Sequence, residues 1–341
     1  MPSVRSAAFG WGLSGGAARP RMARPNWLRI RGPLPLGTRR MLGLCSFLLP
    51  LLVWAIVSYV PFIWHPNMLV TNPGDVDYFQ VGMSVDRATF ASEVTSALQA
   101  KQAPPQGVPA NPLYLPSPGA VASAFIAAFT SSAGNAEGGW MLASLWKSIQ
   151  VIFWGFLISS LIGVPLGILA GANTAVSHLV EPIVEFFRYL PAPAFGALAV
   201  AVLGIYDGPK IAIIVIGTLF QQILIVANTT RKVEFGLVEA ALTLGCRNGR
   251  LLSKVIVPAI LPDLYRDQRV LLGWAWTYLI VAELVGATSG ISLFITQQAR
   301  HQHFAAVFAG IAVIGIVGLG TDLLLGRLGR RLFPWDRSAA L

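Results

Sequence analysis

The chain has 341 residues, of which 55% are hydrophobic and only 12% are charged, and its mean hydropathy is +0.64. Soluble domains carry about a quarter charged residues, so this composition excludes an ordinary soluble protein and indicates that lipid surrounds much of the chain. The net charge of +10 is compatible with nucleic-acid binding, with an anionic surface, or with the excess of basic residues on the cytoplasmic side of membrane proteins. Cys45 and Cys246 lack a CxxC or Cys/His neighbour, so we expect no metal site and no disulfide framework.

The amino-terminal part divides into a tail and a first span. Residues 1–40 are rich in Arg, Gly and Pro and contain no acidic residue, which predicts a disordered cytoplasmic tail. Residues 41–64 form an apolar run without a charge. Spanning a bilayer takes about 20 residues, and a signal peptide has a shorter apolar core, so we expect a retained transmembrane helix.

Residues 65–140 follow as an external segment. We expect one short helix near 86–100, and a second, amphipathic one over 119–130 that lies at the membrane surface, because Pro118 is well placed to begin a helix. Two alternatives stay open for the segment. It is a partly ordered loop, or it is a small cap that binds a partner protein.

Residues 141–326 hold five more apolar stretches, and residues 327–341 form a basic carboxyl terminus. The stretches predict transmembrane helices over 147–171, 184–205, 209–229, 268–288 and 304–325. Together with the first span they make an all-α, polytopic membrane protein of about six transmembrane helices.

The distribution of basic residues predicts the orientation. Six spans place both termini and the loop 230–269 on the same side, and these segments hold most of the 25 basic residues. The opposite side holds only Arg87, Lys101, Lys147, Lys210 and Arg300. Because positive charge collects in the cytoplasm, both termini and this loop are predicted to be cytoplasmic, and the high charge needs no nucleic-acid partner.

The loop between the fourth and fifth spans carries the most specific motif. It runs Glu-Ala-Ala from Glu239 to Ala241, reaches Gly245 three residues later, and after nine more residues reads Val-Ile-Val-Pro up to Pro258. Val238, Ala241, Leu242 and Gly245 are spaced to share one helix face, and small residues there would let a helix sit in a groove on a partner. Gly245 permits a tight turn before a second short helix.

This motif resembles the cytoplasmic loop of bacterial ABC-importer permeases, the inner-membrane components of binding-protein-dependent transport. Four further features resemble the nitrate, sulfonate, taurine and bicarbonate branch. They are Leu-Pro-Ser-Pro at 115–118, Leu-Trp-Lys-Ser at 145–148, Phe-Arg-Tyr-Leu-Pro-Ala-Pro-Ala at 187–194 and Val-Ala-Glu at 281–283. The resemblance covers about 115–335. The tail and the segment 65–114 fall outside it, and Ala192 and Gly196 depart from the bulkier residues or proline common in the family.

The resemblance implies a type I ABC importer permease fold, in a bacterial inner membrane, with residues 235–257 as the segment that couples to an ATPase. The coupling residues are then Glu239, Ala240, Ala241, Gly245 and Pro258. The implied partners are ABC ATPase subunits, a second permease copy that is either identical or a paralogue, and a solute-binding protein on the outer face. The implied solute is a small anion or zwitterion such as a sulfonate, nitrate or bicarbonate.

Four residues are candidates for the solute path or its gate. Glu283 is the only acid deep in a predicted span, where a carboxylate is costly and is usually functional or paired. Its alternative is a structural partner for a hydroxyl or for Arg300. Pro191 and Pro193 can break the third span, as broken helices often line solute paths. Arg188 could attract an anion, although it could also be an interface charge near Glu185.

Other functions lack sequence support. The sequence contains no Gly-x-x-x-x-Gly-Lys-Ser/Thr loop and no catalytic grouping outside the spans, so we expect no enzyme activity, no cofactor on this chain and ATP-Mg on a partner. A secondary transporter, with Glu283 in the solute or ion path, remains the alternative; it should show paired ionisable residues and repeated halves. Gly163, Gly167 and Gly171 predict close helix packing, and Asp322 is expected to pair with a carboxyl-terminal arginine.

Overall fold

The computed structural model describes residues 34–60, 65–110, 115–130, 141–285 and 289–336. The chain divides into two compact units, Met1–Val53 and Trp54–Leu341. Helix α1 (Leu36–Tyr59) supplies the described part of the first unit and runs into the second. It begins directly after Pro35, five residues earlier than the predicted span 41–64, so part of the predicted tail 1–40 is helical. The rest of that tail, 1–33, lies outside the described residues.

Residues 67–110 form a small sheet and a helix, of which only the helix was predicted from the sequence. Strands β1 (Asn67–Asn72), β2 (Ser84–Asp86) and β3 (Gln106–Ala110) form an antiparallel sheet in the order β2-β1-β3. Helix α2 (Arg87–Gln99) lies where a short helix was predicted, and the Asp86 side chain caps its first turn. Val70, Phe79, Val85 and Phe90 make a hydrophobic core of their own. The all-α class therefore describes the membrane part of the chain, whereas residues 67–110 are mixed.

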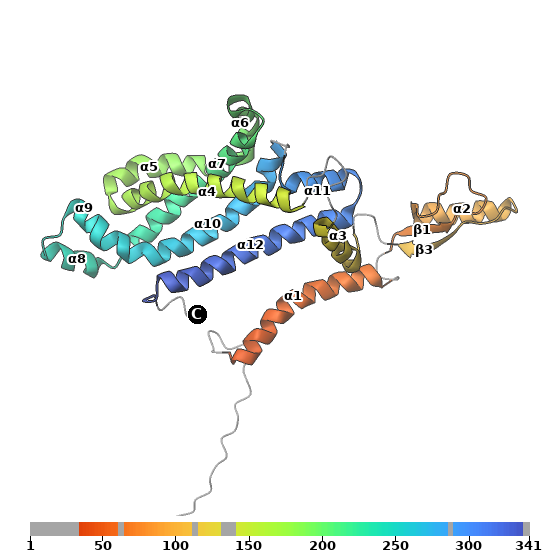
Figure 1. Cartoon of the computed structure of the whole chain (residues 1–341), viewed down its shortest axis with the longest axis horizontal. Coiled ribbons are helices and arrows are strands. Elements are labelled where there is room, and N and C mark those ends of the chain that lie inside the picture. Colours follow the sequence, from red (N-terminus) through yellow and green to blue (C-terminus); the bar gives the residue numbers. More distant parts are fainter. Residues whose placement is uncertain (1–33, 61–64, 111–114, 131–140, 286–288, 337–341) are drawn as a thin grey trace, which may run out of the picture. The chain divides into compact units, whose positions relative to one another are not determined.

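The membrane part is a bundle of long helices (Figure 1). Four described helices are long and apolar enough to cross a membrane: α1, α4 (Met141–Ala172), α7 (Asp207–Arg231) and α12 (Phe304–Leu332). Helices α4, α7 and α12 contain the predicted second, fourth and sixth spans, whereas α1 ends at Tyr59, before the end of the predicted first span 41–64, of which residues 61–64 lie outside the described residues. The predicted fifth span, 268–288, begins within α10 (Val257–Val285), which is longer than a span and carries Asp263, Arg266 and Asp267 in its first half. The short helix α3 (Pro118–Thr130) matches the predicted 119–130.

The predicted third span is not one helix. Helix α5 (Thr174–Phe187) ends before Pro191, a 3-10 turn covers Ala192–Phe195, and α6 (Gly196–Leu203) leaves at 83° to α5. Proline cannot donate the backbone hydrogen bond that a continuous helix needs, so Pro191 and Pro193 explain the break. The predicted break in the third span is therefore present, and α5 and α6 together form either one broken span or a re-entrant loop.

Glycines bring α4 and α7 into close contact. A Cβ at Gly167 would lie 2.7 Å from Val226 Cβ and 2.8 Å from the Ile223 carbonyl oxygen. A Cβ at Gly171 would lie 2.5 Å from the Ala227 carbonyl oxygen. Small residues spaced in this way let helices approach in lipid, so the packing role predicted for these glycines is confirmed.

Replacing Gly167 with leucine should force α4 and α7 apart. Overpacking a close contact of this kind costs about 1–3 kcal/mol, so we expect a clearly lower unfolding midpoint of the purified protein in detergent. Gly315→Leu is the matched control, because a Cβ at Gly315 meets nothing within 4 Å. An equal loss of stability in both variants would contradict the packing role of Gly167.

Candidate functional site

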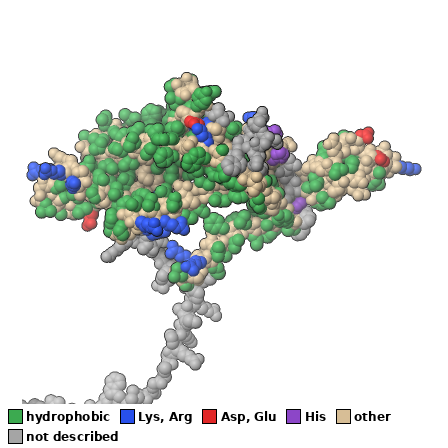
Figure 2. Space-filling view, in the orientation of Figure 1, with side chains coloured by type: hydrophobic (Ala, Val, Ile, Leu, Met, Phe, Trp, Pro, Cys, Tyr) green, Lys and Arg blue, Asp and Glu red, His purple; other side chains and the backbone are tan. Residues whose placement is uncertain are grey.

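The predicted coupling loop forms a helical hairpin between α7 and α10. Helix α8 (Phe235–Thr243) is followed by a turn, the single-turn helix α9 (Asn248–Leu251) and a π-helical segment (Leu252–Ile256) that leads directly into α10. In Figure 1 the hairpin lies at one end of the bundle, and α11 (Ile291–Arg300) lies at the other. Lys and Arg side chains gather at the hairpin end, while the face over α4, α5 and α7 is largely hydrophobic (Figure 2).

Gly245 determines how α8 ends. Its φ is +82°, a conformation that side-chain-bearing residues rarely adopt. The Cys246 N–H donates to the Ala241 carbonyl at 3.0 Å, and the Gly245 N–H donates to the Leu242 carbonyl at 2.9 Å. This pair of bonds is the Schellman motif, which satisfies carbonyls that have no partner within the helix. The spacing from Ala241 to Gly245 thus fixes the turn between the two helices.

Part of the α8 face predicted to meet a partner is covered by the chain itself, whereas Leu242 and Gly245 of that face are exposed. Ala241 is only 9% exposed, and Val238 is half-buried, so these two small residues face their own chain. Glu239 and Ala240 are exposed. Four large apolar side chains are also exposed on and beside the helix: Phe235, Leu237, Leu242 and Leu244. The surface available to a partner is therefore apolar and bulky, and Pro258, also exposed, lies at the start of α10.

Glu283 caps the beginning of α11 from a different helix. It lies near the end of α10 and is 1% exposed. Its Oε1 accepts from the Ser148 hydroxyl at 2.5 Å, and its Oε2 accepts from the Ser292 N–H at 2.8 Å. The Ser148 oxygen in turn accepts from the Ile291 N–H at 2.9 Å. The first N–H groups of a helix have no internal acceptor, and Ser148 and Glu283 supply acceptors for the first two of α11, those of Ile291 and Ser292.

The same region requires glycine at position 290. Gly290 has φ +111°, and a Cβ there would overlap the Glu283 carboxylate. The geometry gives Glu283 the hydroxyl partner that was one of its predicted alternatives. It also shows that both carboxylate oxygens are engaged inside the chain. The assignment of Glu283 to a solute path stays a prediction.

A second set of charges lies next to this cap. Lys210 is fully buried, and its Nζ donates to the hydroxyl and the carbonyl of Ser289 at 2.9 and 3.2 Å. Asp207 forms an ion pair with Lys147 at 2.7 Å and lies 3.5 Å from Lys210. These contacts tie α7 and α4 to the segment that precedes α11. Sequence reasoning placed both lysines on the outer side and missed their structural role.

A polar network crosses the middle of the bundle. The Gln222 side chain on α7 is fully buried; its Oε1 accepts from Ser159 at 2.7 Å, and its Nε2 donates to Ser160 at 2.9 Å and to Gln268 on α10. Thr229 donates to Asp267 at 2.5 Å. The only signal in the sequence was the presence of polar residues within apolar runs. Side-chain hydrogen bonds of this kind hold helices together in lipid.

The remaining predicted residues are spread apart. Arg188 is exposed, and it donates to the hydroxyl of its neighbour Tyr189 at 2.7 Å. Asp322 pairs with Arg269 of α10 through both carboxylate oxygens, and not with a carboxyl-terminal arginine as predicted. Pro191 and Pro193 flank the break, where Ala192 is buried. The assignment of Arg188 and the two prolines to a solute path likewise stays a prediction.

These features define a polytopic α-helical membrane protein with an exposed helical hairpin at one end of its bundle. A family model matches residues 163–334, and its description is binding-protein-dependent transport system inner membrane component. The chain belongs to this family. The match includes the hairpin, the broken third segment and Glu283.

Individual relatives agree with the family. The taurine transport system permease protein TauC of Escherichia coli is 32% identical over 229 residues, which cover 66% of this chain and 81% of TauC. The Bacillus subtilis protein SsuC, named for aliphatic sulfonates transport, is 34% identical over 59% of this chain and 72% of its own length. A solved inward-facing structure of the MetNI methionine ABC transporter shares the fold, with 20% identity, a TM-score of 0.52, and coverage of 58% of this chain and 98% of that one.

Proposed function

We propose that this chain is the membrane-embedded permease subunit of an ATP-driven importer, and that α8 is the helix through which a separate ATPase acts on it. The family match supports the transport role. The observation that carries the coupling role is the exposed apolar surface of α8, set in a hairpin whose turn is fixed by Gly245. Exposed apolar side chains gathered on one helix are typical of a protein-protein contact.

The proposed assembly has a second permease, identical or paralogous, and two ATPase subunits that dock on residues 235–257. Glu239, Ala240 and Gly245 belong to the contact region, Ala241 supports it from inside, and Pro258 begins the helix that leads away. ATP and Mg²⁺ would bind the partner ATPases, and this chain would carry out no catalysis. The basic residues of the hairpin favour a cytoplasmic position for it and for both termini.

The sheet unit, residues 67–110, would then lie on the outer face. Its own hydrophobic core supports the predicted alternative of a small cap rather than a loop. A solute-binding protein is the partner proposed for that face.

For the solute we propose a small sulfonate, by extension from the names of the relatives TauC and SsuC. Uptake of radiolabelled taurine by cells that express the complete importer tests this directly. Aliphatic sulfonates, nitrate and bicarbonate serve as competitors. Competition by nitrate or bicarbonate without competition by any sulfonate would contradict the proposed class.

A cysteine crosslink tests the coupling role. With Cys45 and Cys246 replaced, Ala240→Cys on the permease should crosslink to the co-expressed ATPase, and the yield should change when ATP is added. Ala241→Cys is the matched control, because the adjacent side chain faces its own chain and should crosslink poorly. Equal crosslinking at both positions, or none at Ala240→Cys in correctly inserted protein, would contradict the proposed contact.

The alternative is a secondary transporter that uses Glu283. Measuring uptake in vesicles that have an ion gradient but no ATP separates the two functions, because an importer of this family should then transport no solute. Uptake that persists and depends on Glu283 would favour the alternative.

A further inference from the structure

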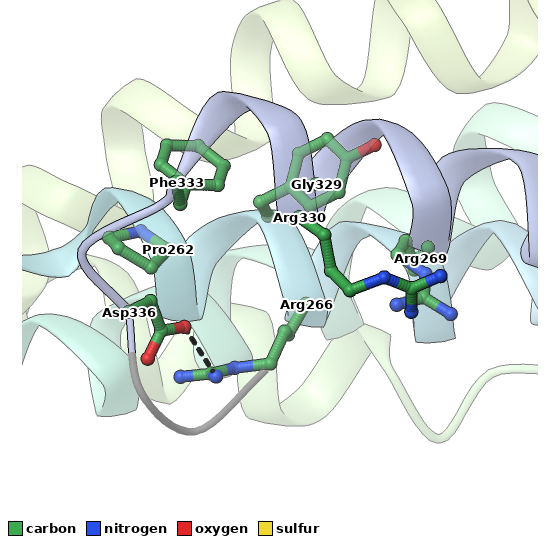
Figure 3. A pocket seen from close by; sticks show the side chains of 9 residues that line it. Pro262, Arg266, Arg269, Gly329, Arg330, Phe333 and Asp336 are labelled. Carbon is green, nitrogen blue, oxygen red and sulfur yellow. Dashed lines mark hydrogen bonds and ion pairs between the residues drawn. The ribbon is translucent and has the colours of Figure 1, made fainter. Parts of the chain in front are cut away.

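A cavity of about 220 Å³ lies between α10 and α12, at the end of the bundle where α12 finishes. Pro262, Tyr265, Arg266 and Arg269 line it from α10. Gly326, Gly329, Arg330, Phe333 and Asp336 line it from α12 and the residues that follow (Figure 3). Sites for whole small molecules usually have about 300–1,000 Å³, so this cavity suits a single charged group better than a complete metabolite.

Two glycines on α12 form part of the cavity wall. A Cβ at Gly326 would lie 3.0 Å from Arg269 Nη2, and a Cβ at Gly329 would lie 2.7 Å from the Tyr265 ring. The arginine and the aromatic ring of α10 therefore rest directly on the backbone of α12. The cavity is thus built by close packing of the two helices.

Three acidic residues nearby match the three arginines of the cavity in number, but they do not engage every guanidinium donor. Arg266 pairs with Asp263 and Asp336, and Arg269 donates from Nε and Nη2 to Asp322. No acceptor is found for Nη1 of Arg269 among the residues described. Arg330 is exposed and likewise has no partner within the described part of the chain, and its side chain extends along the cavity in Figure 3. Free guanidinium donors of this kind match the oxygens of a phosphate group.

The aromatic residues indicate the depth of the cavity in the membrane. The Tyr265 ring lies 5.6 Å from Phe333, and Phe333 lies 5.6 Å from Trp335, which is exposed. The Tyr265 hydroxyl donates to the Leu325 carbonyl at 2.8 Å. Trp and Tyr collect at the level of lipid headgroups, and the apolar span predicted over 304–325 ends just before the cavity. A membrane phosphate would therefore be within reach.

We propose that this cavity binds the phosphate of an anionic phospholipid headgroup, with Arg330 and Nη1 of Arg269 as its donors and the aromatic side chains as its wall. Basic pockets between transmembrane helices on the cytoplasmic side bind such headgroups in other membrane proteins. The site is independent of the solute and of the ATPase contact, so it stands apart from the proposed function.

Native mass spectrometry of the purified full chain, titrated with phosphatidylglycerol, tests the proposal. Arg330→Gln should weaken lipid binding about tenfold, because it removes a hydrogen bond between two charged groups. Arg331→Gln is the matched control, because it removes the same charge from the next residue, which is exposed and does not line the cavity. We expect less than about a twofold change for it, because an exposed charge outside the cavity contributes little.

Four results would overturn the proposal. Equal weakening by the two substitutions would show a general effect of surface charge. Unchanged binding in Arg330→Gln would remove its donor role. Displacement of the lipid by millimolar inorganic phosphate would show that the cavity takes a free anion in place of a headgroup. Equal binding of phosphatidylcholine would also count against it, because that headgroup has no net charge.

Discussion

Gly245→Val should reduce ATP-driven uptake by about tenfold while the protein still inserts in the membrane. The left-handed conformation costs a side-chain-bearing residue about 1–2 kcal/mol, and more for a β-branched one. A cost of 1.4 kcal/mol lowers the population of the correctly shaped turn about tenfold. The exposed face of α8 would then be presented at the wrong angle. The measurement is solute uptake by reconstituted vesicles, together with ATP hydrolysis by the partner.

Gly249→Val is the matched control for this substitution. Gly249 lies at the start of the second helix of the hairpin, has no left-handed φ, and has open space where a side chain would project. We expect uptake close to that of the unmodified protein. If both variants lose uptake equally, the hairpin is sensitive to any added bulk, and the special role of Gly245 is wrong.

Glu283→Gln should lower the free energy of unfolding by about 1.5–3 kcal/mol, which is the contribution of a hydrogen bond to a charged group. The amide keeps one acceptor oxygen for Ser148, but its NH₂ group would face the Ser292 N–H, so one bond that begins α11 is lost. Uptake should fall in parallel with stability. The measurement is the unfolding midpoint in detergent, compared with uptake in vesicles at the same protein level.

A double-mutant cycle with Ser148→Ala tests whether Glu283 acts through this contact. Because the two side chains form one network, the combined loss should be smaller than the sum of the single losses. Glu185→Gln, at an exposed position on α5, is the control and should change little. If Glu283→Gln abolishes uptake with an unchanged unfolding midpoint, the carboxylate acts in the solute path, and the capping role is secondary.

The length of the apolar runs and the spacing of apolar residues predicted most of the membrane helices, because both depend only on residues that are close together in the sequence. The spans over α4, α7 and α12 follow from uncharged stretches, and the hairpin follows from the spacing between Glu239 and Pro258. The break at Pro191 was predicted from proline chemistry. By contrast, α10 carries acidic and basic residues in its first half, and their partners Asp322, Asp336 and Thr229 lie on α12, just after α12 and on α7, respectively. The sequence of one segment does not show which residues of distant segments it will contact.

Two parts of the candidate site could not be predicted for the same reason. Ser148 and Glu283 are 135 positions apart, and only the folded bundle brings them together. Ala241 was expected to face a partner, but the return of the chain through α9 and the π-helical segment covers it. The sheet unit was missed because its strands have only three to six residues and because β3 contains Pro109, which is unusual within a strand.

The unbroken helix α10 joins the two regions described above. From Val257 to Glu283 it extends about 39 Å at 1.5 Å per residue. A tilt of about 10° at the hairpin end would displace the Glu283 end by about 7 Å over this length. Glu283 is hydrogen-bonded to Ser148 on α4 and to the first residues of α11. A displacement of Glu283 would therefore also move α4 and α11. A small rotation imposed on α8 would thus reach the opposite end of the bundle as a joint displacement of α10, α4 and α11.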